Sequence, residues 1–263
     1  MQAHSLIDRV GARALGAFEG AGAIAMFGAH AVVDTLRPPY ELREIIRHAY
    51  QFGYRSAPLI ITAGIAVGVV LSMHTRASLE RFGAEAMIPA ALAIALIRET
   101  GPLITGLLVA GRVGAGIGAE IGAMKVTEQI DALEATAVDS FRYLVVTRVI
   151  ACVIALPLLT TVMNVTGILG GFAAETAITG VPMRTYFRQA FSPIQFSDLI
   201  PATLKTMVFG FIIATAASYL GVNTTRGTEG VGQASTRSVV LSSMLLILAN
   251  VLLVRIIFFF YPA

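Results

Sequence analysis

Arg98 and Glu99 are adjacent charged residues near the centre of an apolar segment of membrane-spanning length. Between residues 86 and 111 this segment contains no other charge. An arginine at the middle of a bilayer costs about 2.5–3.5 kcal/mol even on translocon insertion scales. Neighbouring residues of a helix point about 100° apart, so the two side chains cannot simply neutralise each other. We expect them either to form structural ion pairs or to line a path for a charged substrate.

A glycine and a proline follow these charges, at Gly101 and Pro102. Pro102 has no N–H to donate to the carbonyl of residue 98, so we expect an interrupted helix and a free acceptor beside the charges. Proteins that build a polar site inside a membrane combine charged side chains with such an interruption. The segment therefore favours a transport protein.

The composition is that of an integral membrane protein. Of the 263 residues, 56% are hydrophobic and 13% are charged, whereas soluble domains carry about 25% charged residues. The clusters of basic and aromatic residues that nucleic-acid binding needs are absent. The single cysteine, Cys152, excludes an intrachain disulfide and is interpreted as a small buried apolar residue. No metal site is predicted, because the histidines lack ligand spacing: His4, His30, His48 and His74.

Uncharged runs predict an all-α polytopic protein with five transmembrane helices, since about 20 helical residues cross the hydrocarbon core. An apolar run of 14 residues precedes them, from Gly20 to Val33, and predicts an amphipathic helix in the membrane interface. Residues 1–55 would form this N-terminal cytoplasmic and interfacial segment, and residues 56–263 the five-span domain. The predicted spans are 56–75, 87–111, 149–174, 206–225 with a start at Pro201, and 238–261.

The basic residues are distributed unequally between the two sides of these spans. By the positive-inside rule, the distribution places the N-terminus in the cytoplasm and the C-terminus outside. The cytoplasmic set is Arg9, Arg13, Arg37, Arg43, Arg47, Arg55, Arg112, Lys125, Arg142, Arg148, Arg226 and Arg237. The outer set is Arg76, Arg81, Arg184, Arg188 and Lys205.

The loop between the second and third spans contains a short amphipathic pattern. Its apolar positions are Val126, Ile130, Leu133 and Ala137, and its acidic positions are Glu128, Asp131 and Glu134. The spacing predicts a helix of about three turns, with Thr127 as its N-cap. Such a helix either docks a partner or is a solvated part of the loop.

Neither common nucleotide-binding motif fits this sequence. Residues 114–119 match the pattern G-x-G-x-x-A, but a transmembrane helix rather than a strand precedes them. The motif G-x-x-x-x-G-K-[ST] is absent, so any ATPase that drives transport is a separate chain. The glycines at 114, 118 and 122, like Gly64 and Gly68, are interpreted as small faces for helix packing, within the chain or between two subunits.

The other charges near the spans have simpler interpretations. Lys205 lies about one turn into the fourth span and either snorkels to the outer interface or faces an inner cavity. Arg255 is expected to snorkel, and Arg237 begins the fifth span. Glu175 and Asp198 flank an outer loop long enough to hold a short helix, and we expect both to be solvated.

The stretch from Arg98 to Gly171 resembles the MlaE (YrbE) family of ABC permeases. It combines R-E-x-G-P, A-G-R-x-G, A-E-I-G and T-E-Q-I-x-A-x-E, and continues into LPLLTTVMNVTGILGG. The five-span layout and the sequence TRSVV before the fifth span also resemble the family, whereas the first fifty residues match only in character. Members of this family are the membrane subunits of bacterial transporters that move phospholipid between the inner and outer membranes.

The resemblance implies a homodimer in the bacterial inner membrane, driven by a cytoplasmic ABC ATPase that binds ATP and Mg²⁺. This chain would be a transport subunit rather than an enzyme and would bind no cofactor itself. A hexameric ring of periplasmic MCE-domain proteins, and often a small STAS-domain protein on the ATPase, complete such complexes. A coupling helix at about residues 120–139 would contact the ATPase, through Glu120, Glu128, Gln129, Asp131 and Glu134.

The resemblance also implies charges along or near the transport path, at Arg98, Glu99, Lys205 and Arg237. Arg98 and Lys205 would neutralise a phosphate headgroup while apolar walls cover the acyl chains. The wall candidates, which no family motif supports, are Leu71, Leu79 and Phe82. Two alternatives stay open. One is an ion-coupled carrier in which Glu99 binds a proton, and the other is a structural anchor for periplasmic lipid-binding domains.

Overall fold

The structure, a computed structural model, describes residues 2–38, 40–225 and 227–260, without the side chains of residues 2–18 and 260. This part of the chain is helical and contains no strand, which confirms the predicted all-α class. The α-helices are α1 (Gln2–Thr35), α2 (Leu42–Leu79), α3 (Ile88–Ala95), α4 (Gly101–Val109), α5 (Ala115–Val126), α6 (Gln129–Ala135), α7 (Thr147–Thr179), α8 (Met183–Phe191), α9 (Phe196–Val222) and α10 (Gly227–Phe260). Two 3-10 turns are η1 (Glu80–Phe82) and η2 (Glu85–Met87), and three π-helical turns are η3 (Leu96–Thr100), η4 (Ala110–Gly114) and η5 (Arg142–Val146).

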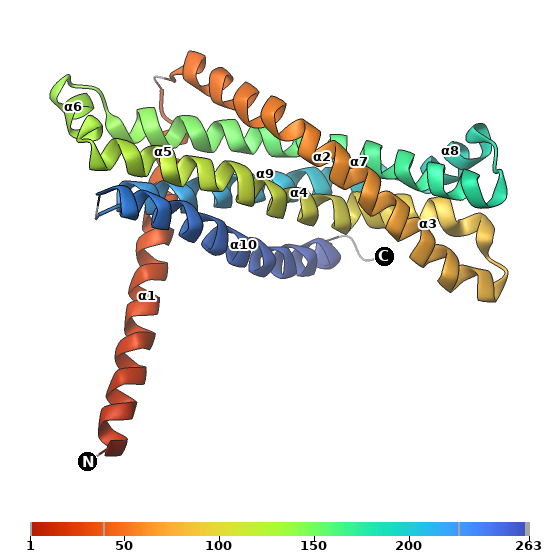
Figure 1. The fold of residues 1–263 in the computed structure, drawn as a ribbon, viewed down its shortest axis with the longest axis horizontal. Coiled ribbons are helices and arrows are strands. Elements are labelled where there is room, and N and C mark those ends of the chain that lie inside the picture. Colours follow the sequence, from red (N-terminus) through yellow and green to blue (C-terminus); the bar gives the residue numbers. More distant parts are fainter. Residues whose placement is uncertain (1, 39, 226, 261–263) are drawn as a thin grey trace.

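Five helical segments are long and apolar enough to cross a membrane, which confirms the predicted number of spans. They are Leu42–Phe82, Glu85–Val126, Arg142–Thr179, Phe196–Val222 and Gly227–Phe259. They form an elongated bundle (Figure 1). Arg226 and Tyr261, the expected end of the fifth span, lie outside the described residues, and so do the side chains of Arg9 and Arg13.

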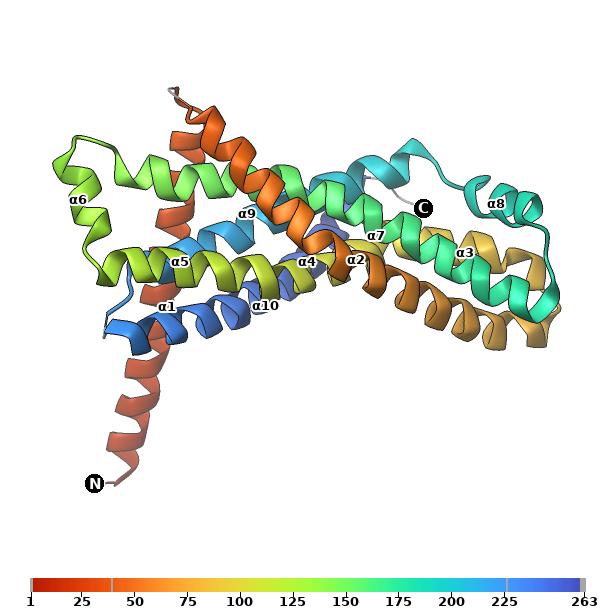
Figure 2. The same cartoon turned by 45° about the horizontal axis from the view of Figure 1, so that its top comes forward.

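Helix α1 is longer than the predicted interfacial run and lies crosswise to the bundle (Figures 1 and 2). Its C-terminal part packs on the bundle through Phe27, whose ring lies 5.1 Å from that of Phe141 and 5.5 Å from that of Tyr219. Asp34 adds an ion pair with Arg142 at 3.7 Å. A helix across the bundle axis is compatible with the membrane interface, and its interfacial position stays a prediction.

The glycine stripes pack helices against each other within this chain. A Cβ on Gly68 would lie 1.9 Å from the carbonyl oxygen of Gly167, so α2 and α7 touch backbone to backbone. On the other side of the bundle, a Cβ on Gly118 of α5 would lie 2.3 Å from Ser238 Oγ of α10. Of the two interpretations of these stripes, intrachain packing is therefore the one observed.

The cytoplasmic loop differs from the expected three-turn helix. Helix α5 continues to Val126, and Thr127 then donates its hydroxyl to the carbonyl of Ala123 and ends that helix instead of capping the next. Glu128 adopts a left-handed conformation, with φ of 58°, which turns the chain into the seven-residue helix α6. The predicted N-cap at Thr127 is thus wrong, because its side chain bonds backwards to the preceding helix.

The fourth span begins earlier than expected. Helix α9 starts at Phe196 rather than at Pro201, because a capping box precedes it. Asp198 Oδ2 accepts a hydrogen bond of 3.0 Å from the backbone N–H of Gln195, and the Gln195 side chain bonds back to the N–H of residue 198. This box stabilises the first turn. The short helix expected in the preceding loop is present as α8.

The second span is interrupted where the sequence predicted. Helix α3 leads into the π turn η3, in which the N–H of Gly101 donates to the carbonyl of Leu96 five residues earlier. A Cβ on Gly101 would lie 1.9 Å from Asn164 Oδ1 of α7, so the glycine allows the two helices to approach closely here. The interruption therefore lies at Arg98 and Glu99, within the span.

Candidate functional site

Lys205 joins the fourth span to the interrupted helix of the second. Its Nζ donates to Glu99 Oε2 at 2.7 Å and to the carbonyl oxygen of Arg98 at 3.4 Å. That carbonyl is the acceptor that Pro102 leaves without its usual helical donor. One ammonium group on α9 thus satisfies both a carboxylate and a backbone carbonyl of η3.

Arg98 contacts the same helix, α9, but closer to its N-terminus than Lys205. Its Nε donates to Asp198 Oδ1 at 2.8 Å. Asp198 also belongs to the capping box, because its other oxygen accepts from the Gln195 N–H. The start of α9 and the position of the Arg98 guanidinium therefore depend on one carboxylate. Two adjacent residues of η3 are held by two residues of α9 that lie seven positions, about two turns, apart.

Each of these two pairs has one buried member and one accessible member. The exposed fraction of the side chain is 0% for Lys205 and 6% for Asp198, but 46% for Glu99 and 47% for Arg98. Lys205 faces the protein interior, so the interpretation in which it snorkels is wrong. The expectation that Asp198 is solvated is also wrong, because the cap and Arg98 hold it inside. The partly exposed Arg98 and Glu99 can still meet a ligand.

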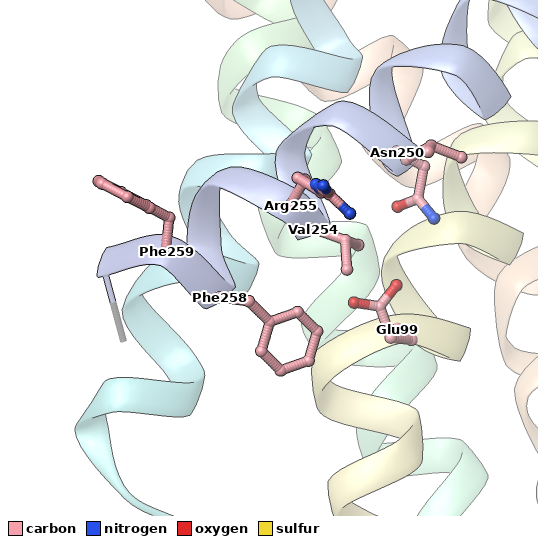
Figure 3. Close-up of a pocket in the computed structure, with 7 residues that line it drawn as sticks. Glu99, Asn250, Val254, Arg255, Phe258 and Phe259 are labelled. Atoms are coloured by element: carbon pink, nitrogen blue, oxygen red, sulfur yellow. The ribbon is translucent and has the colours of Figure 1, made fainter. Parts of the chain in front are cut away.

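A pocket of about 760 Å³ opens beside Glu99 (Figure 3). Its other lining residues come from the last turns of α10: Asn250, Val251, Val254, Arg255, Phe258 and Phe259. Arg255, which was expected to snorkel to the interface, is exposed and lines this pocket together with Glu99. The volume is typical of sites for small ligands, and most of the lining is apolar with a few polar groups, which is also typical.

A second buried cluster joins α2 to α7. Glu175 is 4% exposed, and it accepts a hydrogen bond of 2.8 Å from Ser72 Oγ and a charged one from Arg76. Arg76 also lies 3.7 Å from Glu85. Glu175 was expected to be solvated, and this is wrong, because Arg76 and Ser72 compensate its charge inside the bundle. These charges are satisfied by each other, so we interpret the cluster as structural.

The structure does not bring the other path candidates to this pocket. Arg237 is exposed on α10, eighteen residues and about 27 Å of helix before Arg255. Leu71 packs against a small apolar cluster between α3, α7 and α8, away from the pocket lining. Leu79 is partly buried near the end of α2, and Phe82, in η1, is 83% exposed. Their role in transport stays a prediction.

The predicted coupling residues gather around the turn between α5 and α6. Glu120 accepts a hydrogen bond of 2.9 Å from the buried Arg148, and Asp131 pairs with Lys125 at 3.2 Å. Glu134 accepts a 2.6 Å bond from Ser140. Glu128 and Gln129 are exposed at the tip of the turn. Ile130 is 5% exposed and anchors α6 on the bundle.

Sequence reasoning did not assign Asp198, Asn250 or Arg255 to the site. Arg255 and Asn250 are polar residues within an apolar span, and that signal was available. Asp198 had no comparable signal, because its partner Arg98 is 100 residues away. Among the described residues, no group of three His, Cys, Asp or Glu side chains could hold a metal ion.

The sequence matches the family model described as permease MlaE over residues 45–256. It is 36% identical to a probable ABC transporter permease protein of Rickettsia bellii, over 97% of this chain and 98% of that protein. It is 31% identical to the intermembrane phospholipid transport system permease protein MlaE of Haemophilus influenzae, over 91% of each chain. It is also 32% identical to the chloroplastic protein TRIGALACTOSYLDIACYLGLYCEROL 1 of Arabidopsis thaliana, over 88% of this chain and 66% of that protein.

Proposed function

Because this chain belongs to the MlaE permease family, we propose that it is the membrane subunit of an ATP-driven transporter of glycerophospholipid. The lipid would move between the inner membrane and a periplasmic MCE-type carrier. The proposal is supported by the name of the Haemophilus influenzae relative, an intermembrane phospholipid transport permease. The structural observation that carries it is a largely apolar pocket within the bundle, lined by the half-exposed Glu99, next to the half-exposed Arg98 in the same turn.

A phospholipid has the chemistry that this site would need. Arg98 uses Nε and one terminal nitrogen toward Asp198, and its side chain is 47% exposed, so further donors remain for a phosphate oxygen. Lys205 stays inside and holds Glu99 and the Arg98 carbonyl, which fixes the shape of η3. The apolar residues of α10 would cover the beginnings of the acyl chains.

The ion pair of Glu99 argues against the ion-coupled carrier. Protonation of Glu99 would leave Lys205, with no exposed side-chain surface, without its counter-charge. An uncompensated buried charge is strongly destabilising. A carrier that protonates Glu99 in every cycle would therefore meet this penalty each time, whereas a lipid transporter can keep the pair intact.

The energy would come from a separate ATPase on the cytoplasmic side. The tip between α5 and α6 would dock in a groove of that ATPase, with the acidic residues Glu128, Asp131 and Glu134 toward it. Two copies of this chain would form the membrane dimer, in the inner membrane with the N-terminus in the cytoplasm. ATP hydrolysis would move the docked turn, and α5, continuous with η4 and α4, would transmit this movement to η3.

The test is purification of the tagged chain from its native membrane in mild detergent, followed by mass spectrometry of bound proteins and lipids. We expect an ATPase, an MCE-domain protein and glycerophospholipid, and ATP-dependent lipid transfer by the reconstituted complex. A preparation that preserves other membrane complexes but yields this chain alone would contradict the proposal. Transfer that persists with a double Arg98→Ala, Glu99→Ala variant in an assembled complex would favour the structural anchor instead.

A further inference from the structure

One stripe of α10 forms most of the wall of the pocket beside Glu99 (Figure 3). Its residues recur at intervals of four, as the pairs 250–251, 254–255 and 258–259, so they share one face of the helix. In Figure 1, α10 ends well short of the end of the bundle that holds α8. Because this stripe and Glu99 line the same pocket, Arg255 lies at about the same depth along the bundle as the charges of η3.

Arg255 differs from the other cations near this pocket in its charge balance. Arg98 pairs with Asp198, and Lys205 pairs with Glu99. Among the described residues, no carboxylate lies within salt-bridge distance of Arg255. Since a guanidinium at membrane depth is unfavourable without a counter-charge, Arg255 gives the pocket a net preference for an anion.

Asn250 adds a second polar group without a partner. Its Oδ1 is buried and accepts no hydrogen bond from the described residues. Buried polar atoms nearly always have a partner, which can be a ligand or water. Figure 3 shows the Asn250 amide on the same side of α10 as the Arg255 guanidinium, above Glu99. Asn250 lines the pocket, so rotation of its terminal amide torsion would let the oxygen accept from a hydroxyl or ammonium group of a bound molecule.

We infer that Arg255 binds the phosphodiester of the transported lipid and that Asn250 accepts a hydrogen bond from the polar end of the same headgroup. A guanidinium presents its donors in a planar fork that matches two phosphate oxygens. Val251, Val254 and Phe258 would contact the apolar part of the lipid next to the phosphate. This inference rests on the proposed function, because free phosphate offers the same anionic oxygens but would not use the apolar wall.

The test measures lipid binding to the purified transporter complex by native mass spectrometry, with phosphatidylglycerol, phosphatidylethanolamine and diacylglycerol. We expect Arg255→Gln to weaken binding of both phospholipids about tenfold, and to leave binding of diacylglycerol, which lacks the phosphate, unchanged. Arg255→Lys would lose less, because it keeps the charge but not the fork. Asn250→Ala would give a smaller loss. Arg184→Gln, which removes an exposed cation of α8, is the matched control and would change nothing.

The outcomes separate this inference from the proposed function. Unchanged phospholipid binding by Arg255→Gln, with the wild type still binding, overturns the inference alone. A wild-type complex that binds none of the phospholipids overturns the proposed function. Displacement of lipid by inorganic phosphate alone would assign the site to free phosphate and overturn the lipid assignment. If Arg255→Gln fails to assemble, as judged by its elution profile, Arg255→Lys and Asn250→Ala decide the question.

Discussion

Lys205 Nζ lies 2.7 Å from Glu99 Oε2 and 3.4 Å from the carbonyl oxygen of Arg98. This one ammonium group resolves two problems that the sequence of the second span creates. Glu99 needs a counter-charge within the membrane, and the Arg98 carbonyl needs a donor because Pro102 cannot supply one. The two partners of this contact differ in their exposure to solvent: Lys205 is fully buried, whereas Glu99 is half accessible.

This difference in burial predicts that removing each partner lowers the stability of the protein by a different amount. Glu99→Leu leaves a buried ammonium without its counter-charge and should destabilise the protein by about 3–5 kcal/mol. Lys205→Met leaves a carboxylate that water can reach and should cost about 1–3 kcal/mol, with part of this loss from the unpaired Arg98 carbonyl. Thermal unfolding of the purified complex would measure both, and an equal or reversed order would contradict this account.

The double variant is the control for that pair. Glu99→Leu combined with Lys205→Met removes both charges, so it should be more stable than Glu99→Leu alone. If transport is then still lost, the pair contributes to function beyond stability. A double variant whose loss equals the sum of the single losses would mean that the two side chains are not coupled.

Asp198 should show separable contributions from its two contacts. Asp198→Asn keeps an oxygen that can accept from the Gln195 N–H but removes the charge that holds Arg98. Asp198→Ala removes both contacts and should be about 1 kcal/mol less stable than Asp198→Asn, which is the usual value of a helix cap. Thermal unfolding gives the stability difference. Equal stability of the two variants would show that the capping box contributes nothing.

Gly68 should not tolerate even the smallest side chain. A Cβ there would lie 1.9 Å from the carbonyl oxygen of Gly167, and two backbones cannot move apart without separating α2 from α7. Gly68→Ala should therefore destabilise the fold by about 1–3 kcal/mol or more. Gly116→Ala is the matched control, because nothing lies within 4 Å of its Cβ position. It should be neutral or stabilising by about 0.5–1 kcal/mol.

The turn before α6 allows a test of ATPase docking in which the charge of one residue changes while the backbone of the loop is kept. Glu128 has a φ of 58°, so Glu128→Gly should relieve strain at this position. Glu128→Arg keeps the same backbone demand but reverses the charge toward the proposed partner. We expect Glu128→Arg to reduce the amount of co-purified ATPase at least tenfold, since a like-charge contact costs several kcal/mol and about 1.4 kcal/mol already corresponds to tenfold. Glu128→Gly should reduce it less, and equal retention by both variants would exclude an electrostatic contribution of Glu128.

Local properties of the sequence determined the spans, the interrupted helix and the two charges within it. Length and hydropathy decide whether a segment can cross a bilayer, and a proline four residues after a carbonyl removes its helical donor wherever the helix lies. The motifs that carry the family resemblance are also local, and the comparisons confirm that family. None of these properties depends on which helices become neighbours.

Only the tertiary structure decided which groups meet. Arg98 and Asp198 are 100 residues apart, and Glu99 and Lys205 are 106 apart. Their pairing depends on how closely α7 and α9 pack against the second span. It also depends on the rotation of α9 about its own axis, and the capping box fixes the residue at which α9 begins. The same packing buried Asp198 and Glu175, whose loop-flanking positions had suggested solvent, and turned Arg255 of α10 toward Glu99. Which side chains become partners depends on the arrangement of the helices, because each of these contacts joins residues that lie far apart in the sequence.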